Sequence, residues 1–455
     1  MFVFKKILSG SKENLKDRIC TLLIRFSEPI IFLSFFSIEG YGEWLILITF
    51  PYYLAISELG FGDVISNEIN MLKERKKIMY CKYLFQNLIK FVIFISLIFF
   101  LVFFLIFYNF DIFNFKTIKY EDLYKILIIL GIYTVISQIN GIFIKFLSIN
   151  NQYNLSVKIS YYNKIAELIF ISFALLVYKN LYEVSLSILI TKIIFLIVTF
   201  ICVEKYIEWF DLKKIREFKL SVSKKFLKKY TIRSLLYSSM PIGQILKLQL
   251  TTLIIGITLG PAMLVISNIY LIMARMPIQI ANIADGIIKI ELAKLYIQKK
   301  TQIFKKYYIT NVYSVFLIGT GYFILMSFFG EFFLKIWLNE KIPFYKEIFI
   351  FFLLYGLIYS TSISIVNPLF STNNFKKISL IFLTNSILFV ISLKVFSQNL
   401  GLIFVSINFV FFEIIYLLYC YFSSKKTFGL EFKDFKLDLT FLRKIFRFLY
   451  LKIKK

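Results

Sequence analysis

Arginine and lysine lie well inside several of the long apolar stretches that make up most of this chain. Placing a cation in hydrocarbon costs roughly 3 kcal/mol or more, so such residues are rare there. They are normally kept where they face a cavity, a partner or a substrate. The four cations that lie deepest in their stretches are Arg25, Lys192, Lys247 and Arg275. The sequence therefore indicates a membrane protein whose interior meets an anion.

The apolar stretches are long enough to cross a bilayer as helices. Hydrophobic residues make up 59% of the 455 residues. A soluble domain of this length would need far more polar residues to cover its surface. A span needs about 20 apolar residues, and only helices or closed barrels satisfy the backbone in lipid. Because the residues do not alternate as barrel strands do, we predict an all-α integral membrane protein. Twelve transmembrane helices are expected, at residues 15–37, 43–62, 84–108, 126–147, 160–178, 184–203, 234–258, 262–287, 308–330, 347–368, 378–396 and 402–422.

The distribution of charge predicts the orientation. The net charge is +27, and most basic residues lie in the connections 72–82, 204–233 and 295–307 and after residue 422. By the positive-inside rule, these connections and both termini lie in the cytoplasm. No cleavage site follows the basic N-terminus, so the first span is expected to be retained. Because the positive charge lies in the connections between spans, we predict no nucleic-acid partner.

A weak internal repeat divides the chain into two halves. Ser148-Ile149-Asn150-Asn151 follows the fourth span, and Ser371-Thr372-Asn373-Asn374 follows the tenth. Six spans per half make the halves parallel, related by an axis along the membrane normal. The tail is basic and amphipathic and is expected to lie on an anionic lipid surface. The predicted parts are an N-terminal six-helix lobe, a basic cytoplasmic loop, a C-terminal six-helix lobe and the tail, at residues 1–203, 204–233, 234–422 and 423–455.

Signatures of soluble enzymes are missing from the sequence. The chain has no histidine, which is the commonest general base and metal ligand. It has no glycine-rich phosphate loop ending in Lys-Ser or Lys-Thr, and no nucleophile elbow. The four cysteines lack CxxC spacing and are expected to stay reduced. We therefore predict no catalytic residue, no metal site and no cofactor, and the pattern favours a transporter over an enzyme.

The deep cations differ in the acids that lie near them. Arg25 and Glu28 share a face of the first span at i, i+3, so an internal ion pair is expected. Glu413 in the last span is a candidate partner for Lys192. The acids Glu28, Glu58, Asp285 and Glu413 are candidate charge partners or ion-coupling carboxylates.

Lys247 and Arg275 have no close acid in sequence. The nearest acid to Arg275 is Asp285, about 15 Å along a helix axis. Either an acid from another span pairs with these cations, or the site is open to water and anions. We favour the open site, since arginine suits a bidentate diphosphate contact and lysine adds a point charge. The predicted substrate-binding residues are Arg25, Lys192, Lys247 and Arg275.

Prolines lie in the same spans as three of these four cations. A proline inside a helix removes a backbone hydrogen bond and bends the helix. Proline is also generally commoner in membrane helices than in soluble ones, which is the simpler explanation. We favour a role in bending during alternating access. The predicted hinge residues are Pro29, Pro51, Pro241 and Pro277.

Several motifs resemble the oligosaccharide-lipid flippases of the multidrug/oligosaccharidyl-lipid/polysaccharide (MOP) superfamily, particularly the Wzx-type O-antigen transporters. Gly40-Tyr41-Gly42-Glu43-Trp44 is similar to the family's YGxW turn, and Ser57-Glu58-Leu59-Gly60-Phe61-Gly62 to its Ser-Asp-Leu-Gly-Phe-Gly motif, with Glu for Asp. Tyr270, Arg275 and Pro277 resemble its Tyr…Arg…Pro eighth helix. The likeness covers nearly the whole chain in layout.

The resemblance implies two six-helix lobes forming a V around a central cationic cavity. It also implies a bacterial inner-membrane flippase for a short glycan on undecaprenyl diphosphate, such as an O-antigen unit of lipopolysaccharide or a capsule unit. The partners would be this lipid-linked glycan, membrane lipids and other glycan assembly proteins. Two alternatives stay open: a multidrug or metabolite extruder of the same fold, and a membrane glycan polymerase or ligase. The short outer loops count against the second alternative.

Overall fold

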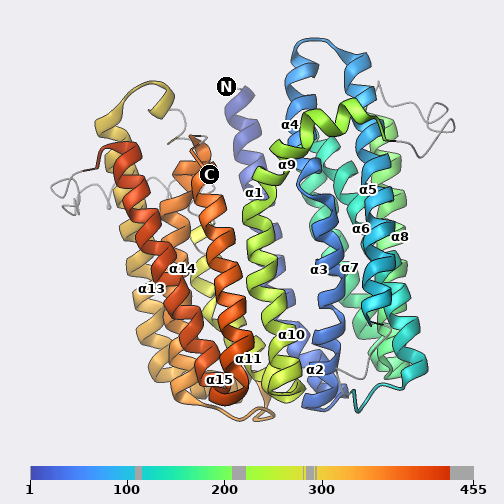
Figure 1. Cartoon of the computed structure of the whole chain (residues 1–455), viewed down its shortest axis with the longest axis vertical. Coiled ribbons are helices and arrows are strands. Elements are labelled where there is room, and N and C mark those ends of the chain that lie inside the picture. The colour runs from blue at the N-terminus through green and yellow to red at the C-terminus, as the bar shows by residue number, and fades with distance from the viewer. Residues whose placement is uncertain are drawn as a thin grey trace. The chain divides into compact units, whose positions relative to one another are not determined.

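The protein is a helical bundle in a computed structural model that describes residues 2–107, 115–207, 222–279, 281–282, 292, 295–372 and 374–430 (Figure 1). Within these ranges the regular elements are helices, and no strand occurs. Contacts divide the chain into two compact units, Met1–Val265 and Ile266–Lys455.

The first unit holds the helices from α1 to α10. They are bent and broken at several places, and short 3₁₀ and π-helical turns (η1 and η4) lie between them. Their bounds are α1 Phe2–Phe35, α2 Ile38–Leu47, α3 Thr49–Ala55, η1 Ile56–Glu58, α4 Phe61–Glu74, α5 Ile78–Phe107, α6 Tyr120–Ile149, α7 Tyr153–Tyr178, α8 Leu181–Tyr206, α9 Lys224–Ile245, η4 Leu246–Leu250 and α10 Thr251–Thr258.

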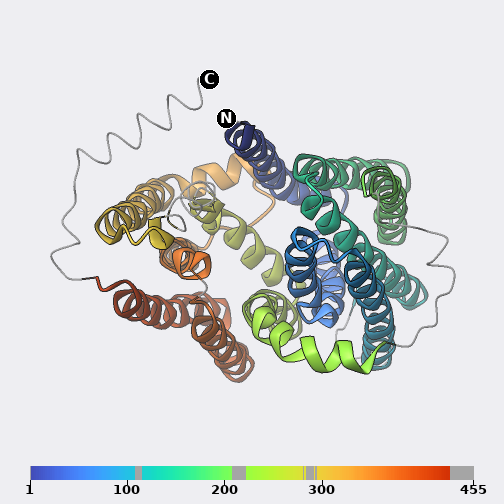
Figure 2. The same ribbon diagram turned by 90° about the horizontal axis from the view of Figure 1, so that it is seen from above.

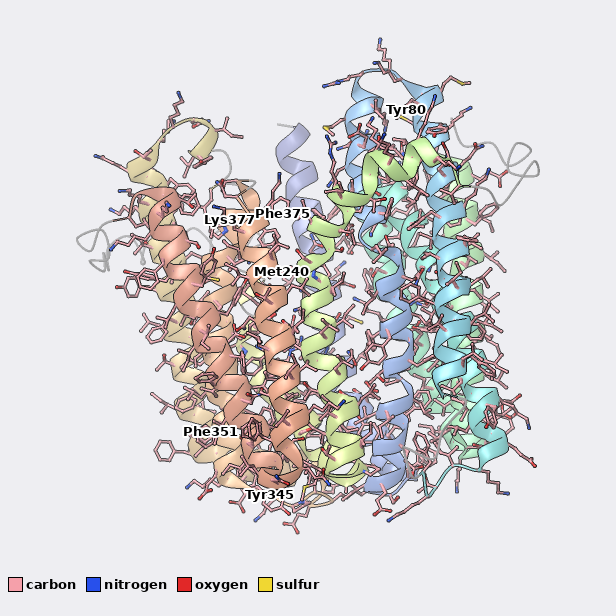
Figure 3. The ribbon with its side chains drawn as sticks, in the orientation of Figure 1. Tyr80, Met240, Tyr345, Phe351, Phe375 and Lys377 are labelled. Atoms are coloured by element: carbon pink, nitrogen blue, oxygen red, sulfur yellow. The ribbon has the colours of Figure 1, made fainter. Side chains whose placement is uncertain are left out.

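The second unit holds most of α11 and three long helices. The bounds are α11 Pro261–Ala274, α13 Thr301–Leu338, α14 Lys346–Ser371 and α15 Lys376–Phe428. α14 packs against both α13 and α15, as the view along the helices shows (Figure 2). Figure 3 labels Tyr345 at one end of α14, and Phe375 and Lys377 at the other end, where the chain turns into α15.

α15 is two helices joined at a kink. Gly401 has φ 70° and ψ −163°, a conformation that only glycine adopts readily. The two arms of α15 correspond to the predicted spans 378–396 and 402–422. Asn385 Nδ2 of the first arm donates to the carbonyl of Phe412 in the second at 3.0 Å, so the arms pack as an antiparallel pair.

The predicted class of fold is confirmed: the chain is an all-α, multi-pass membrane protein. By length and composition, eight of the described helices can cross a membrane, or nine if a bent pair in the second predicted span counts as one. This number is smaller than the twelve predicted spans for two reasons. α15 counts as one helix although it covers two predicted spans, and breaks divide other predicted spans into shorter helices. The break after α2, for example, leaves Ile38–Leu47 with ten residues.

The compact units divide at Val265, because α9 and α10 pack against α4 and α2. The start of α9 is fixed to α5, where Tyr83 Oη donates to Ser223 Oγ at 2.8 Å. The predicted lobe boundaries at residues 203 and 234 therefore stay a prediction. Much of the predicted 204–233 loop and nearly all of the predicted tail, at 208–221 and 431–455, lie outside the described residues.

Glu43 of the YGxW-like turn fixes one end of the first unit. Its carboxylate is fully buried and accepts the backbone N–H of Lys116 at 2.6 Å and that of Thr117 at 3.1 Å. The Thr117 hydroxyl also donates to it. The neighbouring Gly42 lets α2 touch the backbone of Pro261, where a Cβ would collide. The motif therefore holds together α2, the segment before α6 and the start of α11.

Replacing Glu43 with alanine leaves these buried N–H groups without their acceptor. Hydrogen bonds to a charged group contribute about 1.5–3 kcal/mol each, so we expect the free energy of unfolding to fall by at least about that amount. The measurement is thermal unfolding of the purified protein in detergent. Glu39→Ala, at an exposed position of the same helix, is the matched control. Equal unfolding temperatures for the two variants would contradict the assignment.

Candidate functional site

Three of the four predicted substrate-binding cations lie inside helices, and Arg275 follows the end of α11. Arg25, Lys192 and Lys247 belong to the first unit, and Arg275 belongs to the second. The surroundings of each cation decide whether it is paired with an acid of the protein or is able to bind an anionic ligand.

Lys192 of α8 is buried and held in an ion pair within the first unit. Its Nζ lies 2.8 Å from Glu167 Oε1 of α7 and 5.3 Å from the ring centroid of Tyr133 of α6. Asn163 Nδ2 also donates to Glu167 Oε1, at 3.1 Å. The sequence pointed to Glu413 as the partner of Lys192, but the carboxylate that contacts it is Glu167. The sequence could have indicated this pair, because Glu167 is an acid inside the otherwise apolar span 160–178.

Lys247 lies in the π-helical turn η4 and is 2% exposed. Pro241, six residues earlier, cannot donate to the carbonyl of Tyr237, so the helical hydrogen bonding is already interrupted there. The Thr251 hydroxyl donates to the carbonyl of Lys247 at 2.5 Å. Single π-helical turns inside α-helices are frequently found at functional sites, which favours a role for this lysine.

Arg275 occupies the break after α11. Pro277 has no N–H for the carbonyl of Met273, and the hydroxyl of Tyr322 from α13 donates to that carbonyl at 2.9 Å instead. The Arg275 Nε atom is buried and has no hydrogen-bond partner among the described residues. The break thus places a guanidinium inside the second unit with part of its donor capacity unused.

The same unit contains a buried carboxylate and several buried tyrosines, two of which, Tyr355 and Tyr416, interact with it electrostatically. Glu413 of α15 is fully buried, and Tyr355 and Tyr359 of α14 and Tyr416 of α15 are 1–3% exposed. Tyr355 interacts electrostatically with both Arg275 and Glu413. Glu413, a predicted charge partner, belongs to the second unit with Arg275, whereas Lys192 belongs to the first.

Arg25 interacts with Glu28 one turn along α1, as the i, i+3 spacing predicts. Pro29 follows directly and lies inside the continuous helix α1. α1 is fixed to α7 by Lys164, whose Nζ lies 2.7 Å from Asp17 Oδ1 and 3.0 Å from the hydroxyl of Thr21. The charges of α1 are thus at least partly balanced within the first unit.

Glu58 lies at the break that follows α3. η1 ends there, Leu59 and Gly60 have φ of 48° and 71°, and the helices on either side are bent by 44°. Lys145 of α6 bridges the break, with its Nζ 3.3 Å from Glu58 Oε1 and 2.9 Å from Asp63 Oδ1. The predicted ion-coupling carboxylate Glu58 is therefore engaged by a lysine.

Gln138 satisfies the backbone at the same break. Its Nε2 donates to the carbonyl of Leu54 at 2.9 Å and to Ser57 Oγ at 3.2 Å. Its Oε1 accepts from Ser96 Oγ of α5 at 2.6 Å. The Ser57-to-Gly62 motif thus forms a helix break whose polar groups are bound by α5 and α6.

Two of the predicted hinge and charge-partner residues remain, Pro51 and Asp285. Pro51 follows the interruption between α2 and α3 at Ile48, and its hinge role stays a prediction. Asp285 lies outside the described residues. No group of His, Cys, Asp or Glu suited to a metal ion occurs among the residues that were placed.

No family model and no curated protein matches the chain at the level of sequence. Solved structures do match its fold. The lipid II flippase MurJ in an inward closed conformation has a TM-score of 0.68 at 18% identity, covering 94% of this chain and 88% of its own. An inward-facing multidrug resistance MATE transporter of the MOP superfamily has a TM-score of 0.67 at 14% identity, covering 90% and 98%. A mutant of the Vibrio cholerae MATE transporter VcmN has a TM-score of 0.55 at 12% identity, covering 95% and 98%.

The chain has the fold of the MOP-superfamily transporters. This agrees with the two-lobe class of fold that the resemblance in the motifs implies. Identities of this size support the fold alone. The cargo has to be argued from the residues of this chain.

The Lys192–Glu167 pair can be tested by exchanging its members. Removing one member of a buried ion pair costs about 3–5 kcal/mol, because the other charge is left uncompensated. We expect Lys192→Met and Glu167→Gln each to lower the unfolding temperature, and the double variant to recover much of the loss. The exposed pair Lys335–Glu331, at 2.9 Å, is the control and should show little change. If the double variant lost as much unfolding temperature as the two single variants together, the ion pair between Lys192 and Glu167 would be rejected.

Proposed function

We propose that this protein is a flippase that moves a polyprenyl-diphosphate-linked oligosaccharide across the bacterial inner membrane by alternating access. Undecaprenyl diphosphate would be the lipid, and an O-antigen or capsule repeat unit the glycan. The diphosphate and sugars enter a cationic interior while the lipid chain stays in hydrocarbon. The fold shared with a lipid II flippase supports a lipid-linked cargo.

The observation that carries this proposal is the placement of Lys247 and Arg275 at interruptions of two successive spans. Transporters commonly bind substrates where membrane helices are discontinuous, because the freed backbone groups and side chains face the site. Lys247 lies in a π-helical turn and Arg275 in the break before Pro277. Each is a cation suited to a phosphate group, the arginine through its planar donor fork and the lysine as a point charge.

The other predicted residues take supporting roles in this proposal. Arg25 and Lys192 add positive potential, although each interacts with a carboxylate of its own unit. Pro51 and Pro277 mark the breaks at which helices bend between states. Both termini lie in the cytoplasm, and the protein moves its cargo without covalent chemistry, beside the enzymes that assemble the glycan.

Replacing Arg275 with alanine tests the anion site. The loss of a charge-assisted contact worth about 2 kcal/mol reduces affinity roughly 30-fold, so glycan export should fall strongly. The measurement is surface glycan in cells that depend on this protein, at matched protein level. Arg275→Lys keeps the charge without the planar donor fork and should retain part of the activity.

Lys394→Ala is the control for this experiment, because Lys394 is an exposed cation of the same unit. Its export should equal that of the unaltered protein. Undiminished export by Arg275→Ala would remove Arg275 from the site and leave the proposed cargo without its main support.

The second candidate function is a multidrug or metabolite extruder, which the MATE transporter match favours. Extruders of cationic drugs are expected to use acidic interiors, whereas the interior residues here include Lys247 and Arg275. Increased drug sensitivity of a deletion strain with normal surface glycan would select the extruder.

A further inference from the structure

One carbonyl at the break after α11 receives its hydrogen bond from another helix. In an uninterrupted α-helix the carbonyl of Met273 would accept from the N–H of residue 277, but Pro277 has none. The Tyr322 hydroxyl of α13 donates to this carbonyl instead, at 2.9 Å. The backbone N–H of Arg275 still donates to the carbonyl of Leu271 at 3.0 Å, so helical bonding continues up to that residue. Tyr322 therefore replaces the donor that Pro277 removes.

Close packing holds Tyr322 beside the break. Gly319 lies one turn before Tyr322 on α13, and a Cβ there would come within 2.8 Å of the Leu357 side chain of α14. The neighbouring Gly356 lies against the carbonyl oxygen of Ala274, where a Cβ would collide. α13 thus packs on α14, and α14 packs on the last residue of α11. The three helices meet closely at the place where the Tyr322 hydroxyl reaches α11.

Arg275, two residues after Met273, is a donor that could take the place of Tyr322. Its guanidinium carries five N–H groups and no acceptor. The Nε atom is buried and has no hydrogen-bond partner among the residues that the structure describes. A carbonyl without a donor inside the bundle is costly, and a guanidinium N–H would relieve that cost. Because the Tyr322 hydroxyl already satisfies the Met273 carbonyl, the guanidinium keeps this donor for another acceptor.

We propose that Tyr322 is a positioning residue that keeps Arg275 able to bind a phosphate group. The inference rests on the proposed function for the identity of the anion. With the hydroxyl in place, the Met273 carbonyl does not draw on the guanidinium, and Arg275 binds the cargo. Without the hydroxyl, the carbonyl accepts a hydrogen bond from Arg275, and a diphosphate has to compete with the protein's own backbone. Tyr322 acts through the break and not through contact with the cargo.

The competition for Arg275 predicts a weaker affinity for phosphate groups. A hydrogen bond from a charged donor shifts such an equilibrium by about tenfold or more. The apparent affinity of a ligand falls with the fraction of protein that is competent to bind it. Removal of the Tyr322 hydroxyl should therefore weaken diphosphate binding on the order of tenfold.

The first experiment measures binding of inorganic pyrophosphate and of farnesyl diphosphate to the full-length protein in nanodiscs. Tyr322→Phe keeps the ring and removes the hydroxyl, and we expect both probes to bind on the order of tenfold more weakly. Ser327→Ala is the matched control, because the Ser327 hydroxyl donates to the carbonyl of Phe323 within α13, at 2.8 Å. It should bind the probes as the unaltered protein does. Equal affinities of Tyr322→Phe and the unaltered protein would overturn the proposal.

A second variant separates positioning from packing. Pro277→Ala returns an N–H to position 277 and so restores a helical donor for the Met273 carbonyl. In that background, Tyr322→Phe should no longer weaken the binding of pyrophosphate. A role of Tyr322 in packing alone would give the same loss in both backgrounds. An equal loss of affinity with Pro277 and with alanine at this position would therefore reject the positioning role.

A third measurement needs no ligand. If Arg275 takes over the Met273 carbonyl in Tyr322→Phe, then removal of the guanidinium costs more stability in that variant than in the unaltered protein. We expect the double variant Tyr322→Phe/Arg275→Met to lose more unfolding temperature than the two single variants together. Strictly additive losses would mean that the guanidinium does not replace the hydroxyl, and the proposed competition would be wrong.

The two proposals fail in different ways. Normal glycan export in Arg275→Ala, with weaker pyrophosphate binding in Tyr322→Phe and its recovery by Pro277→Ala, would reject the flippase site and keep the positioning role. Loss of export in Arg275→Ala with unchanged probe binding in Tyr322→Phe would keep the flippase and reject the role of Tyr322. Absence of any probe binding to the unaltered protein would overturn the phosphate site and, with it, the role of Tyr322.

Discussion

Each backbone polar group that a break exposes inside this bundle has to find its partner within the protein. In water a lost helical hydrogen bond is replaced by solvent, but in hydrocarbon each unsatisfied backbone group costs several kcal/mol. The break before Pro277 illustrates the consequence. The Met273 carbonyl has no helical donor, and Tyr322 of α13 supplies one at 2.9 Å. The helix can therefore be interrupted at Arg275 only because a neighbouring helix carries the right hydroxyl.

The break after α3 obeys the same requirement with different groups. Gly60 takes up a left-handed conformation and lies against the backbone of Ser234 in α9, which a side chain would not allow. Gln138 binds the backbone at Leu54, and Lys145 binds carboxylates on both sides of the bend. A short motif in one span thus depends on residues from α6 and α9, far away in the chain.

This dependence explains which parts of the structure the sequence could predict. Span length and charge asymmetry are local properties, so the all-α membrane fold and the interior position of Lys192 were predictable. The i, i+3 pair of Arg25 and Glu28 was predictable for the same reason. The partner of Lys192 was not, because the rotation of α7 against α8 decides that Glu167 is the acid that reaches it. Likewise, Tyr322 and Tyr355 gained their roles only through the packing of α13 and α14 beside α11.

The two interior cation–carboxylate systems differ in a way that bears on transport. Lys192 and Glu167 are in direct contact at 2.8 Å, so an incoming anion would have to displace a carboxylate to reach the lysine. Tyr355 interacts electrostatically with both Arg275 and Glu413, and the guanidinium keeps a buried N–H without a partner among the described residues. A contact pair holds helices together, whereas a cation with an unused donor is able to accept a ligand. On this physical ground Arg275, rather than Lys192, is the cation best suited to bind and release an anionic cargo.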